Sequence, residues 1–353
     1  MSAIIRSFLV PPSLSLAAGL LALVTSLIPS ISVGQGPQAI PLSRTELTRA
    51  SSAAITELVW TPDGLLYSGD WDGNICVWKP GRKTTVKSFD VAGNFIRSLG
   101  VLEKGARYIA CLNDGVVIGK LPSGIVQDKF SRIPDGQGYN SRALLSPDEK
   151  TVVVQVGFTA AKIFSTSTLQ ETGRLKMPEN GPVGNIAFTP SGGLLVCSTE
   201  LLHFPPGQMT HDFSLPLRGD AIAIECSPDA RMVAVASMSQ VSVAELKAGA
   251  PVRTLTTKAG ALEAVVWSPD GRRIAATGAS GVVEFFDPAT GALKETLTIL
   301  PGQTSSLAFS PDGKWLAIGG GHYLDRTLTP ARKMTGDNTI RLLSVNFPPP
   351  KGR

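Results

Sequence analysis

Short apolar runs alternate with turn-forming residues along most of the chain. Four such runs follow one another in one stretch, at Leu262–Trp267, Arg272–Thr277, Gly281–Phe286 and Ala292–Leu297. Runs of about six residues that are rich in Val, Ile, Phe and Thr and are punctuated by Gly and Pro predict β-strands. The stretch therefore predicts four consecutive strands joined by tight turns.

A four-residue turn recurs at a nearly constant spacing. It reads Ser-Pro-Asp-Gly at Ser268–Gly271 and Ser310–Gly313, and with its variants its prolines stand at positions 62, 147, 190, 228, 269 and 311. The gaps between them are 85, 43, 38, 41 and 42 residues, so a degenerate copy is expected near Glu103–Gly105. Seven copies at this period, each surrounded by short strands, predict a seven-bladed β-propeller of four-stranded antiparallel blades.

The chemistry of the turn fits this role. Pro presets φ near −65° at the first central position, and Asp can hydrogen-bond its own backbone. Gly supplies the positive φ with which the chain enters the next strand. Several of the predicted second strands are apolar without alternation, as at Met232–Ala236, which predicts strands buried between neighbouring blades.

Blade one reads Ser-Gly-Asp-Trp-Asp-Gly-Asn-Ile-Cys-Val-Trp over Ser68–Trp78, and the third strand of blade six ends in Phe286-Asp287. With the Ser-Pro-Asp-Gly turns, these residues resemble the WD-repeat family over residues 42–346, in a divergent form of a bacterial, exported type. The resemblance implies a rigid ring that binds proteins. The family's Gly-His pair is absent and its third-strand Trp occurs only as Trp78, so its buried Asp-His-Ser-Trp network is not expected.

The two ends of the propeller are predicted to meet. Blade seven has strands at Ser305–Phe309, Trp315–Gly319 and Thr339–Val345 but no fourth strand before the Pro-rich tail of residues 347–353. An isolated strand at Leu42–Thr48 precedes blade one. We expect this N-terminal strand to complete blade seven and close the ring, because closure covers an open sheet edge.

Residues 1–34 predict a secretory signal peptide. Arg6 precedes the apolar run Leu14–Ile28, and small residues follow at Ser32 and Gly34. The alternative is an uncleaved anchor, but a run of 15 residues is shorter than the roughly 20 that span a bilayer. A linker follows at residues 35–41. The propeller is therefore expected to be periplasmic or extracellular, with membrane contact only through an uncleaved N-terminal segment.

The distribution of charge and the spacing of the cysteines argue against nucleic-acid binding and a zinc site. The net charge of +5 is scattered, without basic runs interleaved with aromatic residues, so no nucleic-acid binding is expected. No Cys-x-x-Cys spacing occurs, and buried free thiols are favoured over disulfides or a zinc site. The four cysteines lie in predicted strands of four different blades: Cys76, Cys111, Cys197 and Cys226.

The histidines offer only a weak metal site. His203 and His211 are expected to face each other across a hairpin of blade four, whereas Asp212 points to the opposite face from His211. No Gly-x-Ser-x-Gly motif and no arrangement typical of a catalytic triad occur. We therefore predict no catalytic residues, no metal and no cofactor.

Two irregular stretches are the candidates for partner binding. The tip Asp70–Asp72 carries a Trp, and its spacing fits a hairpin turn rather than a calcium loop. The connection Gly319–Asp337 is far longer than its counterparts, and long connections are usually functional or disordered. Closure brings blade seven beside blade one, so we predict a recognition patch; the alternative is a solvated loop that pairs with these aspartates. The patch consists of Asp70, Trp71, Asp72, His322, Tyr323, Arg326, Arg332 and Lys333.

These observations predict an exported, non-enzymatic propeller that serves as a protein-binding or scaffold module. Fold alone does not define chemistry. One alternative is a lactonase-like propeller hydrolase, which requires carboxylates or histidines and a metal around the central channel; we expect no such cluster. The other resembles the periplasmic propeller of the Tol system, whose ring is six-bladed.

Overall fold

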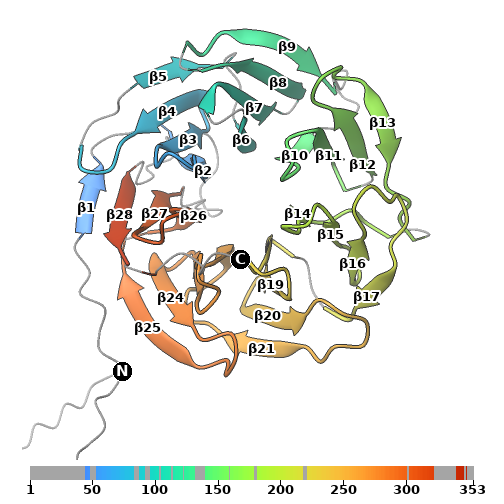
Figure 1. Ribbon diagram of the computed structural model, residues 1–353. Coiled ribbons are helices and arrows are strands. Elements are labelled where there is room, and N and C mark those ends of the chain that lie inside the picture. The colour runs from blue at the N-terminus through green and yellow to red at the C-terminus, as the bar shows by residue number, and fades with distance from the viewer. Residues whose placement is uncertain are drawn as a thin grey trace, which may run out of the picture. The chain divides into compact units, whose positions relative to one another are not determined.

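The computed structural model describes much of the chain from residue 44 to residue 347 (Figure 1). The described ranges are 44–47, 53–82, 87–91, 96–102, 105–112, 114–121, 123–131, 140–158, 160–178, 181–217, 221–299, 302–321, 339–345 and 347. All of them belong to the unit Ala39–Arg353. The predicted signal peptide and linker lie outside the described residues. No helix in the described ranges has the length and apolar character needed to cross a membrane.

Seven four-stranded antiparallel sheets form a ring, as predicted (Figure 1). Blades one to three comprise β2 (Ile55–Trp60), β3 (Leu66–Asp70), β4 (Asn74–Trp78) and β5 (Lys87–Asp90); β6 (Ser98–Leu102), β7 (Arg107–Leu112), β8 (Gly115–Lys120) and β9 (Val126–Phe130); and β10 (Asn140–Leu145), β11 (Thr151–Val156), β12 (Ala160–Ser165) and β13 (Glu171–Arg174). Blades four and five comprise β14 (Ile186–Phe188), β15 (Leu194–Cys197), β16 (Leu201–Phe204) and β17 (Phe213–Leu215); and β18 (Ala223–Cys226), β19 (Met232–Ser237), β20 (Gln240–Glu245) and β21 (Arg253–Thr256). Blade six comprises β22 (Leu262–Trp267), β23 (Ile274–Gly278), β24 (Val282–Phe286) and β25 (Leu293–Thr298), and blade seven comprises β26 (Thr304–Phe309), β27 (Trp315–Gly320), β28 (Ile340–Ser344) and β1 (Arg44–Leu47).

We label the four strands of each blade a to d from the centre of the ring outwards. The degenerate copy predicted near residue 104 is confirmed, because β6 and β7 pair around it. In blade four the predicted strand Val183–Phe188 begins later, at Ile186. There the backbone of Gly184 and Asn185 still pairs with Cys197, and the side chain of Asn185 donates to the carbonyl of Ile222 in the next blade.

The recurrent turn between strands a and b has one geometry. In blade six Ser268 Oγ donates to Asp270 Oδ1 at 2.6 Å and accepts the N–H of Arg273 at 2.9 Å. Gly271 closes the turn with φ +69°, as predicted. In blade five Ala230 occupies the same place at φ +60°, a conformation that costs a residue with a Cβ about 1–2 kcal/mol.

Apolar contacts between adjacent blades form the core. The b strands are buried on both faces, as predicted: all five residues of β23 and all four of β15 are buried. One contact cluster, for example, joins Val235 of blade five to Leu195 and Leu215 of blade four. Each blade is therefore covered on both faces only by its neighbours.

One bond of the family's Asp-His-Ser-Trp network is present, although the four-residue network was not expected. In blade one the indole Nε1 of Trp78 donates to Ser68 Oγ at 3.0 Å, and both side chains are buried. The family's Gly-His pair remains absent from the sequence. Because Trp78 and Ser68 are both buried, the bond satisfies two polar groups that would otherwise lack a partner.

Blades one and seven lie side by side. The indole of Trp60 in β2 donates to the carbonyl of Ala308 in β26 at 3.0 Å. On the outer side β1 pairs antiparallel with β28, with Arg44 opposite Leu343 and Leu47 opposite Ile340. These four residues are the described part of the predicted strand 42–48. That this strand is what closes the ring stays a prediction.

We expect a protein that begins at residue 51 to be less stable than one that begins at residue 35. Removal of β1 leaves the edge of β28 without its backbone partners. The melting temperature should fall by roughly 5 °C or more, or the protein should aggregate. Differential scanning calorimetry of the two proteins measures this, and equal melting temperatures would exclude closure by this strand.

The turn predicts a matched pair of substitutions. Ala230→Gly relieves the strained φ, and the net gain after the greater freedom of the unfolded chain is about 0.5–1 kcal/mol. Gly271→Ala should cost a similar amount, because nothing lies within 4 Å of the added Cβ and only φ changes. Urea unfolding of both variants tests this, and changes of the same sign would contradict it.

Candidate functional site

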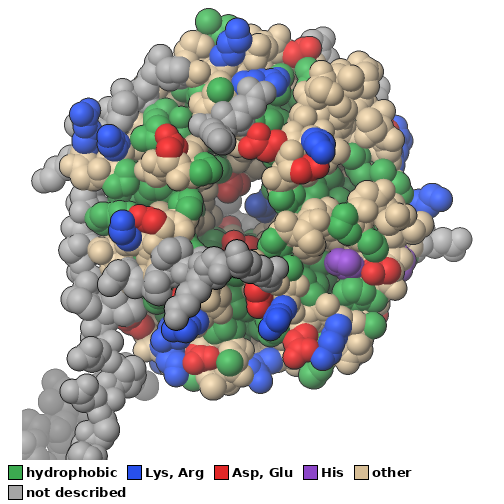
Figure 2. Space-filling view, viewed as in Figure 1, with side chains coloured by type: hydrophobic (Ala, Val, Ile, Leu, Met, Phe, Trp, Pro, Cys, Tyr) green, Lys and Arg blue, Asp and Glu red, His purple; other side chains and the backbone are tan. Residues whose placement is uncertain are grey.

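The antiparallel order gives the ring two chemically different faces. Turns a–b and c–d lie on one face, and turns b–c and d–a on the other. The a–b turns satisfy their own polar groups and carry local ion pairs. These pairs are Lys150–Asp148 at 3.7 Å, Arg231–Asp229 at 3.8 Å and Lys314–Asp312 at 3.2 Å. Figure 2 shows a face of the ring on which acidic and basic side chains lie close together around the central opening.

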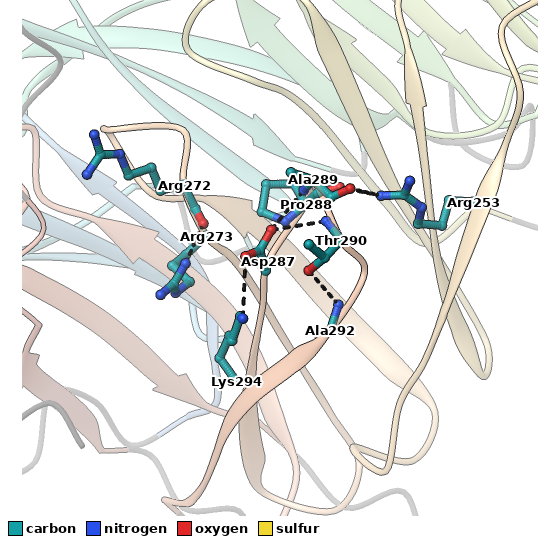
Figure 3. A network of polar contacts seen from close by, with 9 residues as sticks. All are labelled: Arg253, Arg272, Arg273, Asp287, Pro288, Ala289, Thr290, Ala292 and Lys294. Atoms are coloured by element: carbon teal, nitrogen blue, oxygen red, sulfur yellow. Dashed lines mark hydrogen bonds and ion pairs between the residues drawn. The ribbon is translucent and has the colours of Figure 1, made fainter. Parts of the chain in front are cut away.

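The polar groups of the c–d turn of blade six also bond mainly to one another (Figure 3). Asp287 accepts the N–H groups of Ala289 and Thr290 at 3.0 and 3.1 Å and lies 3.5 Å from Lys294 Nζ. Burial raises the pKa of Asp287, but these hydrogen bonds and Lys294 outweigh it and lower the pKa overall. Arg253, from strand d of blade five, donates to the carbonyl of Pro288 at 3.0 Å. Such turns offer few unused polar groups to a partner.

Exposed large apolar side chains lie on both faces of the ring: Ile125, Val126 and Leu293 at c–d ends, and three others at b–c turns. Trp71, Phe158 and Met238 stand at the b–c turns of blades one, three and five, with exposed fractions of 40%, 62% and 63%. We call these three residues the apolar tips. Large apolar and aromatic side chains exposed on a rigid surface are the kind of residue that anchors protein partners. Sequence analysis identified Trp71 but missed the other two, although the repeat register places them at equivalent turns.

Of the predicted patch, Asp70, Trp71 and Asp72 are described. Asp70 is buried, and its Oδ1 accepts the N–H groups of Asp72 and Asn74 at 2.9 and 2.8 Å. The N–H of Trp71 donates to the carbonyl of Ala54 at 3.2 Å. Asp70 therefore shapes the turn, while Trp71 and Asp72 are exposed on it.

The other five patch residues lie outside the described residues: His322, Tyr323, Arg326, Arg332 and Lys333. The two ends of their connection are described. Gly319 pairs with Ile340, and the N–H of Gly320 donates to the carbonyl of Thr339 at 3.0 Å. The b–c hairpin of blade seven is thus complete without the long connection.

The histidines of blade four do not face each other, contrary to the expectation. His203 Nδ1 lies 2.7 Å from Asp212 Oδ1, and its ring stacks on Phe213. His211 contacts the edge of Phe204 on the other face of the strand. All four cysteines are buried free thiols, and burial raises the pKa of each to about 12. Thiols with such pKa values are inert at neutral pH.

A polar cavity of about 530 Å³ occupies the central channel. Strands a and adjoining residues of six blades line it, and its charged side chains are Glu57, Arg97, Arg142, Glu225 and Glu263. The channel therefore contains carboxylates that sequence analysis did not place there. Within the described ranges, no group of three or more His, Cys, Asp and Glu side chains is placed to hold a metal ion.

Hydrogen bonds tie these channel groups to neighbouring blades. Arg142 Nη1 donates to Asn185 Oδ1 at 2.9 Å, and its Nη2 lies 4.0 Å from Glu57 Oε2. Glu225 Oε2 accepts the backbone N–H of Trp267 at 2.7 Å. Glu263 Oε1 accepts from Gln303 Nε2 at 2.7 Å.

Burial raises the pKa of three carboxyl groups in the channel. It raises the pKa of Glu225 to about 8, against the opposing effects of the Trp267 N–H and Arg142. Burial also raises the pKa of Glu57 and Glu263, opposed by Arg142 and by Gln303 respectively. Near neutral pH Glu225 is therefore mainly protonated.

A signal for the channel was present in the sequence. Aligned on the recurrent turn, Glu57, Arg142 and Asn185 each stand four residues before its Ser or Thr, in or just before the first strand of their blade. A single repeat read alone does not reveal it, because one polar residue in an inner strand has no partner within its own blade.

Comparison with known proteins identifies three of the repeats. Residues 43–79, 249–287 and 294–342 match the family described as WD domain, G-beta repeat. They cover the start of the ring and its last two blades. No curated protein matches the chain.

The raised pKa of Glu225 predicts a pH-dependent stability. The unfolded state loses this proton near pH 4.5 and the folded state only near pH 8, so the carboxyl costs stability increasingly as the pH rises between these values. Glu225→Gln keeps an oxygen acceptor for Trp267 and removes the ionisation. The free energy of unfolding of this variant, relative to wild type, should rise from pH 5 to pH 8.5 in urea titrations. The exposed Glu200→Gln is the control, and a pH-independent difference for Glu225→Gln would contradict the assignment.

Proposed function

We propose that this seven-bladed propeller, three stretches of which match the WD-repeat family, is a non-enzymatic binding module whose b–c face engages a protein partner. Propellers of that family generally serve as protein-binding scaffolds. The observation that carries the proposal is the set of apolar tips, Trp71, Phe158 and Met238, exposed on that face.

The contrast between the two faces supports this choice. The a–b turns bind their own Ser, Asp and cationic side chains, so a partner there would have to break existing hydrogen bonds. The apolar tips release water when a partner covers them. They also stand on short hairpins whose backbone is fixed by the ring, so little entropy is lost on binding.

The long connection of blade seven extends the proposed surface. It departs from the b–c end of blade seven, beside blade one, which carries Trp71. Its residues His322, Tyr323, Arg326, Arg332 and Lys333 supply aromatic and cationic groups, which are frequent anchors in interfaces. We propose that they complete the partner-binding surface with Trp71 and Asp72.

Export belongs to the same proposal. The support is the sequence of residues 1–34, with one basic residue, an apolar run and small residues before Gln35. The proposed partner is then a protein of the periplasm or the extracellular space. Mass spectrometry of the protein from its native host tests this: a mature chain beginning near Gln35 is expected, and an intact N-terminus in soluble cytoplasm would exclude it.

Single substitutions at the apolar tips should separate binding from folding. Trp71→Ala and Phe158→Ala should weaken the affinity for a captured partner by roughly tenfold or more, because aromatic anchors dominate interfaces. Melting temperatures should stay within about 2 °C of wild type, since exposed side chains contribute little to stability. Surface plasmon resonance with the purified partner measures the affinity.

The matched control is Ile125→Ala. Ile125 is 63% exposed, like Phe158, but lies at the c–d end of blade two. A partner that is lost with Ile125→Ala and retained by both aromatic variants would place recognition on the opposite face.

A further inference from the structure

The central channel is a second candidate site, separate from the apolar tips. Its cavity of about 530 Å³ falls within the size range of small-molecule sites. It lies among the first strands of the blades. A macromolecular partner on the b–c face does not require it.

The cavity contains charges of both signs. Arg97 and Arg142 come from blades two and three, Glu225 and Glu263 come from blades five and six, and Glu57 of blade one lies 4.0 Å from Arg142 Nη2. These pairs of blades stand on opposite sides of the ring (Figure 1), and both signs of charge are visible in the central opening (Figure 2). A cavity with this arrangement favours a ligand that carries both charges over a ligand with one.

Several polar atoms in the cavity have unused hydrogen-bonding capacity. Glu225 and Glu263 each use one carboxyl oxygen in a hydrogen bond, to Trp267 and Gln303. The Nε of Arg142 is buried without a hydrogen-bond partner. Buried polar atoms are nearly always paired, and this N–H belongs to a side chain that lines the cavity.

We propose that the central channel binds a small zwitterionic solute of the amino acid or dipeptide class, with its carboxylate towards Arg142 and Arg97 and its ammonium group towards Glu263 and Glu225. A guanidinium binds a carboxylate through charge-assisted hydrogen bonds, and a carboxylate pair accepts from an ammonium group in the same way. A single inorganic ion would fill only a small part of the volume and satisfy only one wall.

Binding should be coupled to the proton on Glu225. An ammonium group beside this carboxyl favours its ionised form, so the complex releases a proton at neutral pH. The heat of binding then depends on the ionisation enthalpy of the buffer. Adhesion of a dipeptide to the outer surface would not show this dependence.

Isothermal titration calorimetry with L-alanyl-L-alanine as the probe tests the proposal on the unmodified protein. We expect binding in the millimolar range or tighter, with a heat that differs between phosphate and Tris buffers at pH 7. N-acetyl-alanyl-alanine lacks the ammonium group and alanyl-alanine amide lacks the carboxylate, and each should bind roughly tenfold more weakly or worse. Absence of binding by the dipeptide, or equal binding by all three compounds, would overturn the proposal.

Two variants locate the site. Glu263→Gln retains an oxygen acceptor for Gln303 but loses the charge, and it should weaken dipeptide binding roughly tenfold. Glu200→Gln, an exposed change at a b–c turn of blade four, should leave it unchanged and serves as the matched control. If Glu263→Gln binds like wild type while it remains folded, the ammonium subsite is excluded. Trp71→Ala should also bind the dipeptide normally, so this proposal and the partner-binding proposal fail separately.

Discussion

Burial of apolar blade faces between neighbours is the interaction on which the rest of the ring depends. A blade such as β22–β25 exposes both faces of its inner strands unless another blade covers each of them. The b strands are accordingly apolar on both faces, and adjacent blades interlock through them. A ring is the arrangement in which every blade has two neighbours, which explains why blade one must lie against blade seven.

Because the faces of the blades are buried, residues at the turns and along the channel have other roles. Strand faces are buried in packing between blades, so the turns and the inner edges of the a strands are left for other contacts. The a–b turns fix the strand hairpin, as Ser268 and Asp270 do. The b–c turns of alternate blades expose Trp71, Phe158 and Met238. In the proposed function, stability and recognition are carried by opposite ends of the same strands.

Closure of the ring leaves a polar channel at its centre. The inner strands meet around a space that their apolar side chains do not fill, and polar side chains from different blades occupy it. Glu225 accepts the backbone N–H of Trp267 in the next blade, and Arg142 reaches Asn185 in the blade after its own. These contacts join neighbouring blades, but they also hold carboxyl groups where burial raises their pKa. Carboxyl groups whose pKa is shifted by burial cluster at functional sites.

The sequence by itself determined the elements that depend on local chemistry. The turn Ser268–Gly271, the strands β2, β11 and β22, the seven-fold repeat and the exposed Trp71 all follow from residues close together in the chain. Only the tertiary structure decided the pairing of His203 with Asp212 rather than His211, and the meeting of Arg142 with Glu57 across the channel. The physical reason is distance along the chain. A turn is fixed by the φ preferences and hydrogen bonds of four or five consecutive residues, whereas the channel is assembled from side chains up to about 250 residues apart that become neighbours only when the ring is complete.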